Sequence, residues 1–283
     1  MKTFVKIWLG IALVAMGFGI ILLIVVVASG GTVVDMPTVS YQESYSDIRN
    51  VDMDIEYGEV KIVEGNEFSI DAENIPEDSL ESSVSNGTWT VKQHNEKEYS
   101  IFGGRVDLGG FWGWRWWDHE APQITITLPS DFIADNFQMY IGAGDVKVEK
   151  ILASEADFVV SAGILVIDEA AISGASKYNV GAGSMELMKL QAKDITVDCG
   201  VGNVFIEGAI TGYNDITCGV GSVNMKLEGS KDDYSYEIES GIGNINIDND
   251  NYHSISDKSI NNNGALGNFS LDCSVGNITV DFQ

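Results

Sequence analysis

The side chains best suited to binding a ligand lie in one short segment. Four of the six tryptophans of the chain and one arginine fall within six positions, flanked and interrupted by glycine: Trp112, Trp114, Arg115, Trp116 and Trp117. Exposed aromatic faces stack on sugar rings, and tryptophan with arginine also suits the headgroup region of a membrane. The segment could equally fold back as a lid over the open apolar end of a repeat structure. These five residues are the candidate binding site, and the lid, the membrane contact and the polymer platform are its three candidate roles.

The other residue patterns do not predict catalysis. Several Gly-x-Gly motifs resemble phosphate loops, but a strand pattern follows each of them, so no helix N-terminus is available to hold an anion. His94, His119 and His253 lie in separate irregular segments, and no nucleophile motif occurs. We therefore predict no catalytic residue and no cofactor. The alternative, a β-helical polysaccharide lyase or hydrolase, would need carboxylates beside basic residues in one groove, whereas Arg49 and Arg105 lie outside the regular repeat.

Cysteine and acidic residues also favour structural roles over metal binding. Cys199, Cys218 and Cys273 occupy equivalent positions of a repeat, which predicts small buried side chains. A bridge between Cys199 and Cys218 is conceivable, although side-by-side parallel positions fit disulfide geometry poorly. The run at 248–251 offers oxygen ligands for Ca²⁺ but lacks the glycine and the distal glutamate of an EF-hand loop. We predict no metal site.

The element that would position any site is a repeat. Its marker is the second glycine of each Gly-x-Gly or Ser-x-Gly motif, and successive markers are separated by 19, 20, 19, 19, 22 and 33 residues. A period near 20 residues indicates stacked structural units. The markers are Gly144, Gly163, Gly183, Gly202, Gly221, Gly243 and Gly276.

Apolar residues recur at every second position on both sides of the marker glycine, which predicts strands with one buried face. The columns five, three and one residue before the marker, and two and four after it, are expected to point inward. Because the phase slips by one residue between these two sets, we expect a bend at the marker and the residue after it, where glycine and asparagine tolerate positive φ. The column directly before the marker is Ala143, Ala162, Ala182, Val201, Val220, Ile242 and Val275.

These features predict an all-β fold, and specifically a β-solenoid with rungs of about 19–20 residues stacked ~4.8 Å apart. The competing interpretation is an antiparallel meander in which each Gly-Asn is a hairpin turn. The solenoid is favoured because stacked copies place like residues in like positions. An early rung at 51–62, with Gly58 at its corner, is expected to be separated from the main stack by an insertion, and the C-terminal strands to form the last rung.

The N-terminus predicts a membrane segment. Lys2 and Lys6 precede an uncharged run at residues 7–28, long enough for a helix that spans the hydrocarbon core. The lysines predict an N-terminus in the cytoplasm and the remainder outside. A cleaved signal peptide is the alternative, since Val26-x-Ala28 resembles a cleavage site. The expected organisation is an anchor at 1–28, a linker at 29–47 and a solenoid at 48–283 with a Trp-rich insertion at 102–120.

The charge of the chain restricts its partners. There are 16 Lys and Arg against 42 Asp and Glu, a formal net charge of −26. Such a surface repels nucleic acid and anionic lipid headgroups. We expect no nucleic-acid partner, whereas a cationic partner is compatible with this charge.

The segment from Ile124 to Pro129, with serial Gly-x-Gly-[Asp/Ser/Asn]-Val rungs after it, resembles the bacterial putative-adhesin family of β-strand-repeat proteins, a domain of unknown function. The resemblance runs from about residue 48 to the C-terminus, and it implies an exported repeat domain with an N-terminal membrane segment. We therefore predict a single-pass membrane protein whose solenoid binds or scaffolds at the cell envelope, as an adhesin-like module or an accessory of envelope-stress regulation. Its expected partners are the membrane, through residues 7–28, and an envelope polymer or protein.

Overall fold

The computed structural model describes residues 38–76, 78–94, 98–101, 104–107, 122–248, 250–253 and 256–283. The chain divides into two compact units, one of Met1–Pro37 with Glu96–Trp117 and one of Thr38–Asn95 with Asp118–Gln283. The described part of the first unit is an antiparallel hairpin of β7 (Glu98–Ile101) and β8 (Gly104–Asp107). Among the described residues, no helix has the length and apolar character needed to cross a membrane. The expected membrane segment at residues 7–28 lies outside them.

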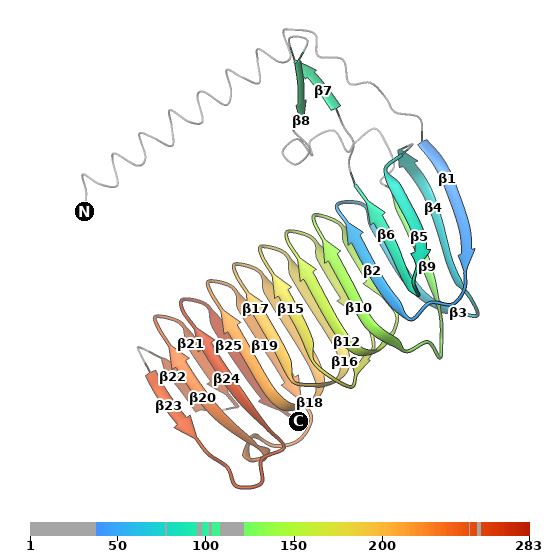
Figure 1. Ribbon diagram of the computed structural model, residues 1–283. Coiled ribbons are helices and arrows are strands. Elements are labelled where there is room, and N and C mark those ends of the chain that lie inside the picture. Colours follow the sequence, from blue (N-terminus) through green and yellow to red (C-terminus); the bar gives the residue numbers. More distant parts are fainter. Residues whose placement is uncertain are drawn as a thin grey trace. The chain divides into compact units, whose positions relative to one another are not determined.

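The second unit is a β-solenoid built from parallel ladders (Figure 1). The first ladder contains the strands that precede the Gly-x-Gly corners; in spatial order they are β6 (Thr88–Gln93), β2 (Asn50–Ile55), β10 (Ala134–Ile141), β12 (Ile151–Val160), β15 (Ser176–Val180), β17 (Ile195–Cys199), β18 (Asn203–Cys218), β24 (Gly267–Cys273) and β20 (Tyr234–Ser240).

The second ladder contains the strands that follow the corners. In the same spatial order they are β9 (Gln123–Pro129), β3 (Glu59–Gly65), β11 (Asp145–Val148), β13 (Ile164–Ile167), β16 (Ser184–Lys193), the start of β18, β19 (Ser222–Leu227), β25 (Asn277–Phe282) and β21 (Asn244–Ile247). A shorter third ladder joins β12, β14 (Ala170–Ile172), β16 and β18.

The pairing register identifies the fold as a solenoid and excludes the meander. Phe158 pairs with Met139 on one side and with Tyr178 on the other, in parallel strands 19 and 20 residues apart in sequence. The aromatic rings of Phe158 and Tyr178 stack inside the unit, with centroids 5.6 Å apart. Each rung therefore lies on a copy of itself, as the period predicted.

Four of the five columns predicted to point inward are buried in every regular rung. They are the columns five and three residues before the marker glycine and two and four after it, for example Val197, Cys199, Val204 and Ile206 in one rung. Their alternation with outward residues gives each strand one apolar face, and stacking joins these faces into one continuous core.

The order of rungs in space differs from their order in sequence. β2 pairs with β6 on one side and with β10 on the other, so the early rung touches the regular stack directly. At the other end, β24 and β25 lie between the β18–β19 rung and the β20–β21 rung (Figure 1). The insertion therefore separates the early rung from the main stack in sequence but not in space, and the expectation of a C-terminal last rung is wrong.

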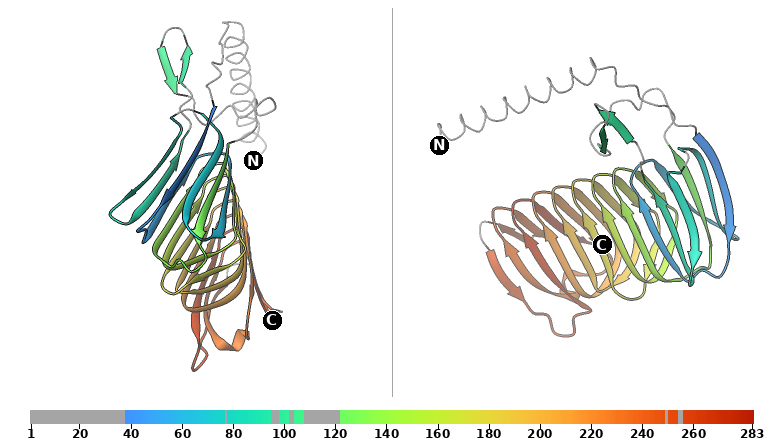
Figure 2. Two further views of the ribbon diagram at one scale, coloured as in Figure 1. Left: turned by 90° about the vertical axis from the view of Figure 1, so that its right-hand side faces the viewer. Right: turned by 45° about the horizontal axis from the view of Figure 1, so that its top comes forward.

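Antiparallel strands cap both ends of the stack. At one end, β5 (Leu80–Ser85) pairs with β6, β4 (Phe68–Pro76) with β9, and β1 (Thr38–Tyr45) with β4 (Figure 2, left). Buried Trp89 and the ring of Phe68 meet there edge to face, with centroids 6.2 Å apart. At the other end, β22 (Asp250–His253) pairs with β21 and β23 (Ser256–Ile260) with β20, and a 3₁₀ helix at Lys231–Asp233 precedes β20.

Candidate binding surface

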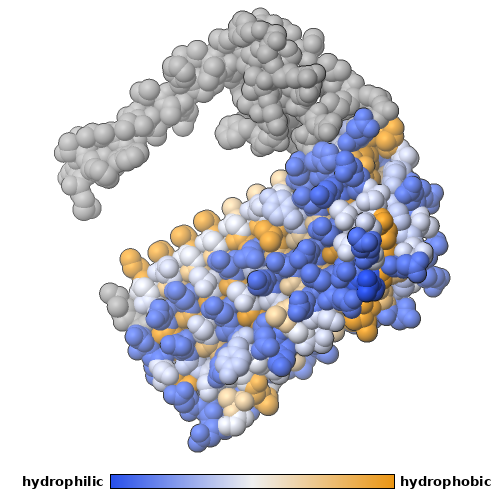
Figure 3. Space-filling model, viewed as in Figure 1, coloured by the Kyte–Doolittle hydropathy of each residue, from blue (hydrophilic) through white to orange (hydrophobic). Residues whose placement is uncertain are grey.

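A row of apolar side chains stands exposed along the Gly-x-Gly corners. We call it the corner ridge; it consists of the residue before each marker glycine, in the spatial order Ala143, Ala162, Ala182, Val201, Val220, Val275 and Ile242. The four large members are among the most exposed hydrophobic residues of the described chain, at 65% for Val201, 59% for Val220, 54% for Val275 and 84% for Ile242. Figure 3 shows apolar side chains projecting in a row along the upper edge of the solenoid, where these corners lie.

Main-chain hydrogen bonds fix the ridge. The amide of each ridge residue donates to a carbonyl of the neighbouring rung at 2.8 Å, for example Val201 to Gly181 and Val220 to Gly200. The same bond length recurs at all seven corners. The ladder therefore continues through the corners without a break, and the ridge side chains project from a rigid backbone.

The prediction that this column is buried is wrong. Val201, Val220 and Ile242 do follow one another in a single file, but the file faces solvent. The marker glycine lies inside in their place, because its backbone passes so close to the rung below that no side chain fits. A Cβ on Gly221 would lie 2.0 Å from the carbonyl oxygen of Gly202. The bend therefore falls at the two residues before the marker, two residues earlier than predicted, and it turns the residue before the marker outward.

Glycine is required at the corners because the backbones of neighbouring rungs lie close together there, and not because the corner adopts unusual dihedral angles. Of the corner glycines, positive φ occurs only at Gly58 in the early rung, and none of the asparagines after the markers adopts it. The first glycine of the motif is less restricted, since Ser161 and Ser274 occupy that position in two rungs. The expectation that these corners need a positive φ is therefore wrong, and the glycine is explained by the lack of space for a side chain.

The two flanks of the ridge differ in charge over its Val/Ile half. On the flank formed by β17, β18, β24 and β20, the outward positions carry five carboxylates and no basic residue; they are Asp198, Asp215, Asp272, Glu237 and Glu239. In each of these rungs, the residue directly before the ridge residue is glycine or serine, so no large side chain lies between the acids and the ridge. On the other flank, asparagine or serine follows each marker glycine. The arrangement is an apolar strip with an anionic border on one side.

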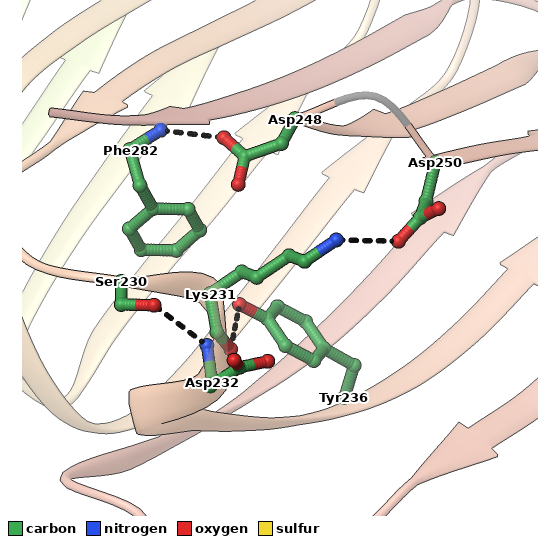
Figure 4. Close-up of polar contacts among 7 residues, drawn as sticks. All are labelled: Ser230, Lys231, Asp232, Tyr236, Asp248, Asp250 and Phe282. Atoms are coloured by element: carbon green, nitrogen blue, oxygen red, sulfur yellow. Dashed lines mark hydrogen bonds and ion pairs between the residues drawn. The ribbon is translucent and has the colours of Figure 1, made fainter.

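The carboxylates at 248–251 that could have suggested Ca²⁺ are engaged within the protein (Figure 4). Asp248 accepts the amide of Phe282 at 2.9 Å, and Asp250 accepts from the ammonium of Lys231 at 2.8 Å. The Lys231 hydrogen bond lowers the pKa of the Asp250 carboxyl. Tyr236 donates to the carbonyl of Lys231, and this cluster joins the 3₁₀ helix to the last rungs. Over the described residues, no group of three or more His, Cys, Asp or Glu side chains is arranged to hold a metal.

The three cysteines form a buried file of free thiols, as the repeat predicted. Cys199 pairs in register with Cys218, and Cys218 with Cys273. Cys199 donates to the carbonyl of Gly202 at 3.2 Å. Burial raises the pKa of the Cys273 thiol to about 11. These thiols pack in the core and are held in their neutral form at Cys218 and Cys273, where the pKa is raised.

The structure leaves the tryptophan site as a prediction. Trp112, Trp114, Arg115, Trp116 and Trp117 lie outside the described residues. The corner ridge, by contrast, was visible in the sequence as a column of alanine, valine and isoleucine, but its alternation with neighbouring apolar columns assigned it to the core. The signal that separates it is the marker glycine, which is the one position of the repeat that never carries a side chain.

The chain is similar to one protein family and, at low identity, to several solved structures. A family model described as Toastrack DUF4097 matches residues 48–208 and again residues 126–281. A solved putative adhesin from Bacteroides fragilis is 12% identical, with 87% of this chain and 98% of that chain covered and a TM-score of 0.44. A putative cell adhesion protein from Clostridium sporogenes is 11% identical, with 87% and 100% covered and a TM-score of 0.34. No curated protein gives a match.

Proposed function

Because the chain belongs to the Toastrack DUF4097 family, which includes putative adhesins, we propose that it is an adhesin-like binding and scaffolding module of the cell envelope. The proposal places the solenoid outside the cytoplasm, with residues 7–28 as its membrane anchor. The observation that carries the binding role is the corner ridge. Large aliphatic side chains that are more than half exposed on a surface of net charge −26 indicate a site that another molecule covers.

Support for the location comes from the sequence at the N-terminus. Lys2 and Lys6 precede the uncharged run at residues 7–28, and this charge asymmetry favours export of the C-terminal part. Of the linker expected at 29–47, residues 38–45 instead form β1, which pairs with β4 in the solenoid unit, so the residues before Thr38 would separate the solenoid from the bilayer. A rigid stack held in this way would present its repeated surface to envelope polymers or proteins.

The location is tested with tagged full-length protein in intact bacterial cells. A tag after Gln283 should be removed by added protease, whereas a tag before Met1 should be protected until the membrane is opened. Fractionation should recover the full-length chain with the membrane. A protected C-terminal tag, or recovery in the cytosol, would overturn the proposed location.

The binding role is tested separately with the purified full-length protein. Chemical cross-linking in intact envelopes should yield a defined adduct, and mixing with acidic or wall-derived polysaccharide should leave the polymer intact. Release of polymer fragments that stops when a single carboxylate is substituted would instead identify a carbohydrate-active enzyme and contradict the binding proposal.

A further inference from the structure

The fold does not require an apolar side chain at the corner ridge. The main chain there is already hydrogen bonded from rung to rung, and the core is formed by the other columns. Threonine has the shape of valine and would stack equally well between neighbouring rungs. Four successive rungs nevertheless place valine or isoleucine at the position where the side chain is 54–84% exposed. The apolar character of the ridge is therefore explained better by a partner than by folding.

The spacing of the ridge favours a helical partner. Its side chains repeat every rung, at ~4.8 Å, which is close to the ~5.4 Å pitch of an α-helix. Same-face side chains of an extended strand are about 6.7 Å apart and would lose register within two rungs. Apolar residues at helical spacing can therefore lie between successive ridge side chains. The seven residues of the ridge span ~29 Å, which corresponds to about 19 residues of helix.

The charge beside the ridge defines the polar face of that partner. Asp198, Asp272 and Glu239 each precede a ridge residue of their own rung by three positions, all on the same flank. The opposite flank carries asparagine or serine. A helix with lysine or arginine along one side of its apolar stripe would match both flanks in a single orientation. A second copy of this chain, or an anionic lipid surface, would bring like charges together.

We propose that the Val/Ile half of the corner ridge, Val201, Val220, Val275 and Ile242, is the docking surface for a basic amphipathic α-helix of a protein partner. The inference rests on the proposed binding function and gives it a site and a partner class. The helix lies along the stack, its apolar stripe contacts the ridge, and its basic side chains pair with Asp198, Asp272 and Glu239.

The test uses the full-length protein in zwitterionic-lipid nanodiscs and a labelled peptide of about 20 residues. The peptide carries Leu and Ala at helical spacing, with Lys beside that stripe. Fluorescence anisotropy should show saturable binding, and circular dichroism should show helix formed on binding. A ridge variant with V201T, V220T, V275T and I242T keeps the β-branched shape, and its affinity should fall about tenfold or more, since each lost contact is apolar.

Three further variants make the result specific. Leu266→Ser removes an exposed aliphatic side chain, 60% accessible, that lies away from the ridge, and it should bind the peptide like the wild type. A charge variant with D198N, E239Q and D272N should bind more weakly at low salt and lose most of the salt dependence. Melting temperatures no lower than that of the wild type would show that all three variants fold, and V220K with V275K provides a second ridge variant whose added charges oppose a basic helix.

Several outcomes would overturn the inference. They are no binding by the wild-type protein, equal binding by the ridge variant, and equal binding of a peptide with Glu in place of Lys. Ridge-dependent binding to phosphatidylglycerol vesicles, without peptide binding, would assign the surface to a membrane instead. If the ridge variant still formed its cross-linked envelope adduct, the ridge proposal would fail while the binding function itself survived.

Discussion

At the scale of single residues, the solenoid depends on one position where nothing but glycine fits. The marker glycine of each rung lies against the backbone of the marker in the rung below, and a Cβ on Gly202 would come within 2.2 Å of the carbonyl oxygen of Gly183. Backbone atoms held in a ladder on both sides cannot move aside as a flexible side chain could. The first glycine of the motif is less confined, because a Cβ on Gly200 would lie 3.0 Å from its nearest neighbour.

Two substitutions within one corner test this difference. Gly202→Ser should lower the free energy of unfolding by at least about 1–3 kcal/mol, the usual cost of overpacking, because the rungs must separate to admit the side chain. Gly200→Ser is the matched control and should cost clearly less, since Ser161 and Ser274 occupy the same position elsewhere. Urea denaturation of both variants gives the comparison. Equal losses would show that room at the marker glycine does not determine its identity.

The buried thiols predict a second residue-scale effect. Burial raises the pKa of Cys273 to about 11 from an ordinary value near 9.0. The folded state holds the Cys273 proton more tightly than the unfolded state does. The neutral thiol therefore contributes fully to the free energy of unfolding below about pH 9, and this contribution is lost as the pH rises through about 11. The free energy of unfolding should therefore fall between these values. Cys273→Ser should show a smaller fall, and the hydroxyl fits because Ser240 in the same column donates to Gly243 at 2.9 Å.

The outcome that would contradict this prediction is an identical pH dependence in the wild type and the serine variant. Alkylation offers an independent measurement. Cys273 should resist iodoacetamide at neutral pH in the folded protein and react after unfolding, because the neutral thiol is a poor nucleophile.

Residue patterns predicted the core well and the corner poorly. Four columns, such as the one containing Val197 and Ile216, are buried as their alternation indicated. The column containing Val201 continues the same alternation, so hydrophobicity alone placed it inside. Its exposure follows from backbone packing at the adjacent glycine, which is a three-dimensional contact between rungs and leaves no trace in the alternation itself.

At the scale of elements, the ends of the stack are arranged differently from its middle. The rung formed by β24 and β25 is the last in sequence, yet it has parallel neighbours on both sides. The rung formed by β20 and β21 is the outermost, and antiparallel β22 and β23 cover its free edge. The polar sequences of these two edge strands discourage pairing with other chains.

Hydrogen exchange distinguishes this order from a simple sequential stack. Amides of β24 and β25 should exchange more slowly than those of β22 and β23, although they lie nearer the chain terminus, because both of their edges are hydrogen bonded. The strands β17 and β19, which lie within the stack, provide the internal reference. Faster exchange at β24 and β25 than at β22 and β23 would indicate that the C-terminal rung is the outer one.

The sequence gives only a faint indication of this rearrangement. The apolar columns of β24 and β25 match those of any other rung, so they fit equally well at the end or in the middle. The one indication is the longer spacing of 22 and 33 residues before the last two markers, which leaves room for a return strand. The early rung likewise pairs directly with the regular stack, although an insertion separates the two in sequence.

At the scale of the whole molecule, the charge imbalance places acidic side chains beside one another. With 42 acidic and 16 basic residues, few acids find a partner of opposite charge. Asp272 pairs in register with Glu239, and Glu239 with Asp257, so three carboxylates follow one another across adjacent strands. Like charges directly opposite in a sheet are destabilising. The solenoid is held together by its core against this repulsion.

Moderate monovalent salt should therefore stabilise the protein. Raising the ionic strength from about 0.01 M to about 0.15 M shortens the screening length from ~30 Å to ~8 Å and weakens the repulsion among exposed carboxylates. For a domain of this size, a gain of about 1 kcal/mol corresponds to a melting temperature about 2–4 °C higher. Thermal unfolding followed by circular dichroism measures the change. Glu239→Gln, which removes the middle carboxylate of the three, should melt higher at low salt and gain less from added salt than the wild type. A melting temperature that stays constant or falls with salt would mean that the acidic residues are compensated within the fold, and the electrostatic contribution of the acidic border to binding a basic helix would have to be smaller as well.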